Sequence, residues 1–166
     1  MTQAQVKSEL IHLMMVQMVE GGLSTTPEYQ RQMQYPSNFD LNIGYQTFAN
    51  PEQNEVVVRL QVDLAGINGK NKNNSSLGIS AKYVYNFHFK VDNLSEFIND
   101  KETISGLLGV TLLSISYSTL RGIVLERTCG TLLGGVILPV VNPAKLLKEN
   151  ALPPPPDVTE PPQTKS

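Results

Sequence analysis

The spacing of apolar residues changes once along the chain, and this change limits the folds open to it. Three stretches alternate between apolar and polar residues, as strands with one buried face do; they are residues 39–48, 55–66 and 81–91. After Asp92 the apolar residues instead recur near helical spacing. Strands first and helices afterwards predict an α+β fold, in which an antiparallel sheet carries helices on one face.

The third strand carries a row of aromatic rings. In 81-AKYVYNFHFKV-91 the rings share one face of the strand, and they are Tyr83, Tyr85, Phe87 and Phe89. We expect them to lie mainly against the chain's own long helix, because burying aromatic area is the largest packing contribution available. Residues 10–19 are apolar on both sides. They predict a fourth strand that is covered on both faces.

The connections suit an antiparallel sheet of four strands. Residues 49–54 are short and contain Pro and Asn, as a hairpin loop does. Residues 66–78 form a longer loop rich in Gly, Asn and Ser. Residues 24–38 are too long for a tight turn and are expected to cross over an edge of the sheet.

The helical part contains a long helix and a shorter one. The long helix runs through residues 104–124, with Asp100 as a candidate N-cap, and Gly106 and Gly109 are expected to serve close packing. Residues 142–150 begin with Asn and then Pro, which is a strong helix start.

An uncharged stretch within the long helix raises the question of a membrane span. Residues 103–120 approach the length that a spanning helix needs. However, they contain seven Ser or Thr and two Gly residues. A helix buried against a sheet or a sister subunit explains this composition better than membrane insertion does.

Composition excludes several classes of function. The net charge is −2, and no Lys/Arg cluster forms a stripe that follows phosphates, so we expect no nucleic acid partner. The most basic stretch, residues 69–74, is better explained as a solvated loop than as a phosphate site. The amino terminus has no basic segment before its apolar run, which argues against a signal peptide and predicts a cytoplasmic protein.

Residues for catalysis or metal binding are sparse. Cys129 is the single cysteine, so no internal disulfide is possible. His12 and His88 are the two histidines, and neither lies in a zinc-binding pattern. Cys129 served by a histidine remains an alternative as a nucleophile, but a single cysteine at an apolar helix end is more typical of packing. We expect no enzyme activity, no cofactor and no metal.

The carboxyl-terminal half adds a more specific pattern. Leu108-Gly109, the stretch 117–121, Gly130-Thr131 and the stretch 139–142 follow one another in an order that resembles the SecB family of export chaperones. In that family a Leu-Gly pair and an aromatic-X-Arg stretch lie on the long helix. A Gly-Thr turn, an apolar loop ending in Pro-Val-Asn and a second helix follow. The resemblance covers roughly residues 10–150, and one extra valine departs from it.

The resemblance implies a holdase without enzyme activity. SecB-like proteins are tetramers built as dimers of dimers, and unfolded precursor chains lie in their apolar grooves. The crossover and the loop before the last helix carry the expected client-binding residues, namely Tyr29, Met33, Tyr35, Leu132, Leu133, Val136 and Ile137. The long helix carries the expected oligomer interface, namely Leu108, Leu112, Ile115 and Tyr117.

The docking partner and the ends of the chain leave alternatives open. In the family an acidic patch docks onto the SecA motor, but here only Glu20 remains on the first strand. The resemblance implies SecA as a partner, and the loss of the acidic patch argues against it. A chaperone dedicated to one client such as an antitoxin, or an oligomeric scaffold for one folded partner, are the alternatives. Residues 1–150 are expected to form the SecB-like domain. Residues 151–166 are expected to form a disordered proline-rich tail, either solvated or bound by a proline-binding domain.

Overall fold

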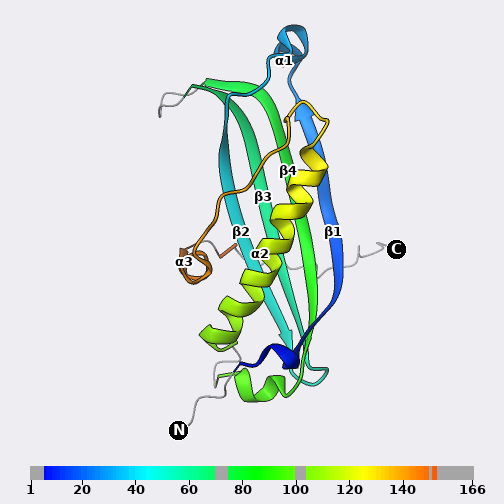
Figure 1. Ribbon diagram of the computed structural model, residues 1–166, viewed down its shortest axis with the longest axis vertical. Coiled ribbons are helices and arrows are strands. Elements are labelled where there is room, and N and C mark those ends of the chain that lie inside the picture. Colours follow the sequence, from blue (N-terminus) through cyan, green and yellow to red (C-terminus); the bar gives the residue numbers. More distant parts are fainter. Residues whose placement is uncertain (1–5, 70–74, 100–103, 150, 153–166) are drawn as a thin grey trace, which may run out of the picture.

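A computed structural model describes residues 6–69, 75–99, 104–149 and 151–152. A four-stranded antiparallel sheet carries a long helix on one face, and a shorter helix lies beside one edge (Figure 1). The α+β architecture expected from the periodicity is thus confirmed. The face of the sheet without the long helix is called the open face below.

The strands follow the predicted stretches but extend beyond them. The sheet has the order β1-β4-β3-β2, so β1 and β2 form its edges. The strands are β1 (Ile11–Thr25), β2 (Asn38–Asn50), β3 (Glu55–Asn68) and β4 (Ser75–Val91). The crossover between β1 and β2 contains a short helix, α1 (Pro27–Gln32), which Thr26 caps by accepting a hydrogen bond from Tyr29 N.

The core forms where the long helix α2 (Gly106–Thr128) packs on β3 and β4. The aromatic row of β4 lies in this core with the buried side chains of α2, as expected. The apolar alternate residues of β3 complete it from the neighbouring strand. Short 3-10 helices, η1 (Ser8–Leu10) and η2 (Leu94–Phe97), flank the sheet, and η2 adds Leu94 and Phe97 to the core.

The helix ends differ in part from the expectation. Ser105 caps α2 by accepting a hydrogen bond from Leu108 N, whereas Asp100 lies outside the described residues. At Gly109 a Cβ would lie 3.5 Å from the side chain of Leu147, which is ordinary van der Waals contact, so close packing does not require a glycine there. Gly106 has no such neighbour, so close packing does not explain it. The second helix, α3 (Pro143–Glu149), starts as predicted, because the Asn142 side chain accepts from Ala144 N.

Among the described helices, α2 is long and apolar enough to cross a membrane by length and composition alone. Its buried residues belong to the same core as β3 and β4. This packing accounts for an apolar helix without requiring a membrane.

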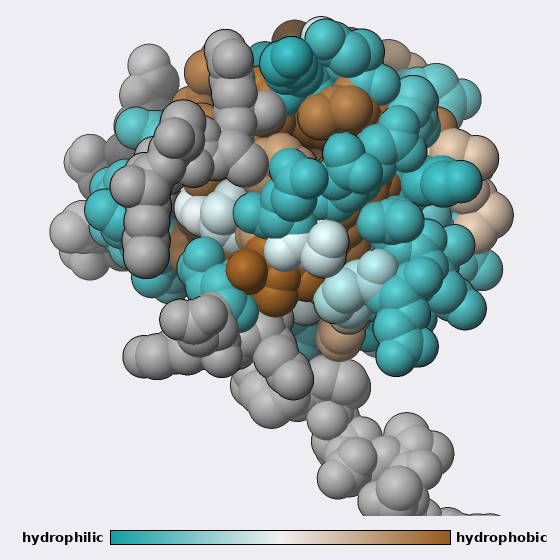
Figure 2. Space-filling model, turned by 90° about the horizontal axis from the view of Figure 1, so that it is seen from below, coloured by the Kyte–Doolittle hydropathy of each residue, from teal (hydrophilic) through white to brown (hydrophobic). Residues whose placement is uncertain are grey.

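The expectation that the first strand is covered on both faces is wrong within the single chain. Helix α2 lies over β3 and β4 and leaves the edge strand β1 uncovered. Two register irregularities interrupt its pairing with β4, between Leu13 and Met15 and between Met18 and Glu20. The residues inserted there are well exposed, and Met14 reaches 65 %. Seen from the end at which β1 begins, hydrophobic residues reach the surface among hydrophilic ones (Figure 2).

The buried aromatic row gives the first prediction. Phe87 is fully buried, so Phe87→Ala should lower the free energy of unfolding by about 3–5 kcal/mol through lost burial and a cavity. Phe48 is 41 % exposed on β2, and Phe48→Ala should cost about 1 kcal/mol or less. Urea unfolding at one protein concentration measures both. Equal losses in the two variants would contradict the proposed core.

Candidate functional site: a groove along the edge strand β2

The loop that joins α2 to α3 forms one wall of a groove, and β2 forms the other. A cavity of about 510 Å³ lies between residues 135–139 of the loop, Leu64 of β3 and the start of β2, where Phe39 and Leu41 are half-buried. A second cavity of about 400 Å³ continues along β2 between Leu41 and Ile43 on one side and residues 140–149 on the other. Because Leu41 lines both cavities, they form one path along the sheet edge.

Three side chains of α2 hold the loop in place. Tyr117 donates to the carbonyl of Pro139 at 2.8 Å, and Arg121 Nε donates to the carbonyl of Leu138 at 3.0 Å. The hydroxyl of Thr128 accepts from the N–H of Val136 at 2.7 Å. These bonds connect the aromatic-X-Arg stretch of the sequence to the apolar loop that follows it.

The tyrosines of this region remain neutral donors. Burial raises the pKa of Tyr117, against a smaller lowering by Arg121. Burial also raises the pKa of Tyr45 on β2, whose hydroxyl donates to the carbonyl of Leu147 at 2.6 Å. A neutral phenol donates to a carbonyl, whereas a phenolate would be repelled by it. Tyr45 thereby fixes α3 beside β2.

The turn after α2 depends on two glycines. Gly134 and Gly135 have φ of 73° and 82°, which residues with a Cβ rarely adopt. Their N–H groups donate to the carbonyls of Thr131 and Thr128, so the turn satisfies its own backbone. Beyond this turn the loop runs without helical structure, and Ile137 is 71 % exposed.

The predicted client-binding residues fall into two groups. Met33 and Tyr35 of the crossover and Ile137 of the loop are well exposed. Val136 lines the first cavity although most of its surface is buried. The other predicted residues of this set complete the core or pack against it, and they are Tyr29, Leu132 and Leu133. Client contact by any of these residues stays a prediction.

The residues predicted for subunit contacts lie mostly on the sheet side of α2. Leu108 and Leu112 are fully buried and Tyr117 nearly so, all within the same chain. Ile115 is partly buried and also packs against the core. These side chains leave little surface for a second subunit. The exposed apolar residue of α2 nearest its start is Leu107.

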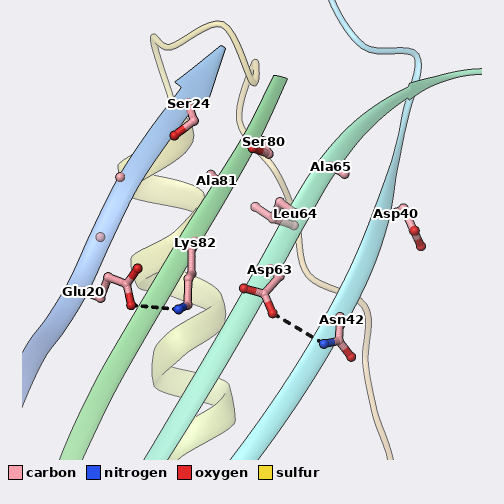
Figure 3. A pocket seen from close by; sticks show the side chains of 12 residues that line it. Glu20, Ser24, Asp40, Asn42, Asp63, Leu64, Ala65, Ser80, Ala81 and Lys82 are labelled. Atoms are coloured by element: carbon pink, nitrogen blue, oxygen red, sulfur yellow. Dashed lines mark hydrogen bonds and ion pairs between the residues drawn. The ribbon is translucent and has the colours of Figure 1, made fainter. Parts of the chain in front are cut away.

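Glu20, the predicted docking residue, lies on the open face of the sheet. It lines a cavity of about 480 Å³ together with Asp40, Asp63 and Lys82. Figure 3 shows these side chains with α2 behind the sheet. Glu20 pairs with Lys82 at 2.9 Å, and this hydrogen bond is the main cause that raises the pKa of Lys82. The pairing offsets the charge of Glu20, although three carboxylates face a single lysine there.

The geometry gives no support to a cysteine nucleophile. Cys129 ends α2 at the end of the sheet where β1 finishes (Figure 1). His12 lies where β1 begins and contacts Asp92, and His88 pairs in register with Met15 nearby. Within the described part of the chain, no three His, Cys, Asp or Glu residues form a group that could hold a metal ion.

Sequence reasoning missed two parts of this surface. Phe39 and Leu41 belong to the alternating stretch 39–48, but alternation does not show which strand forms an edge and so does not predict their place in the groove. The exposed apolar residues of β1 were missed because a strand that is apolar on both sides normally lies inside a core. The signal present was the run of methionines at 14–18, which is typical of adaptable contact surfaces.

Comparison with solved structures shows a SecB-like fold. The chain is similar to the Mycobacterium tuberculosis SecB-like chaperone Rv1957, solved in complex with a ChAD peptide from the Rv1956 HigA1 antitoxin. The identity is 15 % and the TM-score 0.57, with 81 % of this chain and 92 % of that chain covered. A protein of unknown function from Streptococcus agalactiae matches at 12 % identity and a TM-score of 0.35, covering 78 % and 97 % of the two chains. That likeness is too low to carry an argument.

No protein-family model matches the chain, and no curated protein matches it. The architecture and the similarity to Rv1957 together confirm the expected fold class.

The loop attachment gives the second prediction. In Thr128→Val the N–H of Val136 loses its buried acceptor, which should cost about 1–3 kcal/mol of stability. Hydrogen exchange at Val136 should accelerate. Thr111 makes the same bond to a helix carbonyl as Thr128 does, but it lies near the start of α2, far along the helix from Thr128. Thr111→Val is therefore the control, and unchanged exchange at Val136 in Thr128→Val would contradict the attachment.

Proposed function

We propose that this protein is a SecB-like holdase that binds extended, unfolded polypeptide segments in the groove along β2. The observation that carries the proposal is the path beside an edge strand. Its first cavity is mainly apolar and has the exposed Ile137 on its wall, and its second cavity mixes aliphatic side chains with Lys145 and Glu149. An extended chain can add hydrogen bonds to a strand edge while its apolar side chains lie in the cavities. The groove therefore suits polypeptides rather than a small molecule.

The character of the wall favours clients of many sequences. Ile137 and Val140 present aliphatic side chains to solvent from a loop without helical structure. Such surfaces adapt to different side chains because they make few directional contacts. Met33 and Tyr35 of the crossover offer further adaptable apolar surface ahead of β2.

The SecB-like neighbour supports a polypeptide client, because that chaperone was solved with an antitoxin peptide bound to it. Two client ranges fit this support. The protein either serves precursors for export in the cytoplasm, or it guards one client such as an antitoxin. Suppression of aggregation of several unrelated denatured proteins would favour the first range, and activity toward a single client would favour the second.

We further propose that the chain assembles into a homotetramer, as a dimer of dimers, through surfaces that include β1. An edge strand with exposed apolar residues on both faces readily pairs with another chain. The side chains of Val16 and Met18 lie on the face of the sheet that carries α2, but the helix does not cover them. Met14 and Val19 add further exposed apolar surface to β1. A second copy would cover this surface, whereas Leu108, Leu112 and Tyr117 are already buried.

The charge of the open face does not favour docking to SecA. Glu20 is paired with Lys82, so the open face offers less free negative charge than three carboxylates imply. A basic partner would therefore gain little electrostatic attraction from docking on this face. The alternative of a scaffold for one folded partner predicts a single tight complex and no suppression of aggregation.

The groove gives the third prediction. Ile137→Ser should weaken binding of a denatured model protein by roughly tenfold or more, since a buried aliphatic side chain is worth about 1.5 kcal/mol or more. Leu107 on α2 is 58 % exposed and lies outside both groove cavities, so Leu107→Ser is the matched control. Light scattering of the aggregating client measures both variants. Equal effects would count against the groove.

The edge strand gives the fourth prediction. Val19→Lys places a charge on β1, as natural edge strands do to block pairing. It should raise the dissociation constant of the oligomer roughly tenfold or more, because at least about 1.4 kcal/mol of contact is lost. Val140→Lys in the loop is the control. Multi-angle light scattering over a dilution series measures both, and a wild-type protein that stays monomeric throughout would refute the assembly.

A further inference from the structure

The segment after α3 returns to the sheet and lies along β2. The N–H of Leu152 donates to the carbonyl of Tyr45 at 2.8 Å, and Ala151 forms a parallel bridge with Tyr45. These two residues were assigned to the tail from sequence, yet they lie against the sheet. They add to the edge of β2 in the way that a bound peptide adds to a strand.

A glycine forms the socket for this segment. Gly44 is buried, and the Leu152 side chain fills the space above it. A Cβ at residue 44 would lie 2.6 Å from Leu152 Cγ, closer than real Cβ atoms approach other groups. The socket therefore exists because residue 44 has no side chain, and it fits a branched aliphatic group of the size of leucine.

The socket lies at the same strand edge as the groove but on the open face of the sheet, because Gly44 follows Asp40 and Asn42 at alternate positions of β2. The second cavity runs along β2 as far as Ile43, and Tyr45 follows two residues later on the same side of the sheet. Leu146 and Glu149 of α3 line that cavity, and Tyr45 bonds to Leu147 of the same helix. An extended polypeptide on the edge of β2 alternates its side chains between the two faces, so it can fill the cavities from one face and place a leucine over Gly44 on the other, where it meets Ala151 and Leu152.

The segment that lies on β2, Ala151 and Leu152, is short and offers few hydrogen-bond donors to the strand edge. Ala151 is exposed and Leu152 is half-buried. Residues 153–156 are all proline, which has no N–H to donate to a strand edge. A longer segment with a free N–H at each residue has more donors to offer the same edge than Ala151 and Leu152 do.

We propose that the edge of β2 at Gly44 and Tyr45 is a leucine-binding end of the client groove, and that Ala151 and Leu152 occupy it until an extended client displaces them. The inference rests on the proposed function. The ligand is an extended polypeptide that runs parallel to β2 and places a leucine over Gly44. The chain's own carboxyl-terminal segment acts as a competitor for that position.

Two variants separate the socket from the segment that fills it. Leu152→Ala empties the socket and leaves it open to a client. Gly44→Val fills the socket and excludes both Leu152 and a client leucine. Gly22 also lies on an edge strand, and a Cβ at that residue would meet no neighbouring group within 4 Å, so Gly22→Val is the control for adding valine to a strand edge.

The probe is a peptide of about twelve residues, long enough to follow most of β2 at about 3.3 Å per residue. It repeats pairs of leucines separated by single serines, so that leucines face both sides of the strand, and it has lysines at its ends for solubility. A second peptide has glycine at every leucine position. When a competitor fills the site for part of the time, the apparent affinity falls in proportion to the fraction of molecules in which the site is free. Leu152→Ala removes the competing side chain, so it should bind the leucine peptide about three- to tenfold more tightly. Gly44→Val should show no such gain, and Gly22→Val should match the wild type.

Hydrogen exchange at the amide of Leu152 gives an independent readout. We expect protection in the free protein, and loss of protection both in Gly44→Val and when the leucine peptide is added to the wild type. If the wild type binds the peptide but Leu152→Ala gains nothing, or if Leu152 stays protected in the complex, the displaceable segment is refuted. If Leu152 is protected in the free protein but neither the wild type nor any variant binds the peptide, the proposed function is refuted. The client site at Gly44 is then refuted as well.

Discussion

The packing of α2 on the inner faces of β3 and β4 is the contact on which the rest of the structure depends. It buries the aromatic row of β4 and gives the apolar helix a partner within its own chain. It also places Tyr117, Arg121 and Thr128 beside the loop that follows the helix. The groove wall is therefore positioned by the same helix that completes the core, so a change in the core also changes the surface that a client would meet.

The same packing determines what remains uncovered. A single helix is too narrow to cover four strands, and α2 lies over the central pair. The edge strands are left with different surfaces. One edge, β2, is lined by the loop and α3, whereas the other, β1, presents methionines and valines without cover from the described chain. The two edges thus suit the two proposed contacts, with a client along β2 and a sister subunit along β1.

Much of the fold could be predicted from the sequence, because alternation reports a strand with one buried face. The order of strands and helices, the aromatic row against α2 and the start of α3 at Asn142 all followed from local patterns. The exposure of β1 could not be predicted, because the sequence of an apolar strand looks the same whether its own chain or another chain buries it. The bonds from Tyr117 and Arg121 to the loop were also not predictable. Their acceptors are backbone carbonyls, which have no sequence signature.

The nature of those acceptors bears on how such a protein can diversify. The hydrogen bonds that fix the loop end on main-chain atoms of Val136, Leu138 and Pro139. The carbonyls of residues 138 and 139 are present whatever residue carries them, and the N–H that residue 136 donates is present in any residue except proline. The outward-pointing side chains at 137 and 140 are therefore not needed for the anchoring, and mutation can exchange them without detaching the segment. Preference for a new guest can evolve, or be engineered, by altering a few solvent-facing groups on an unchanged scaffold.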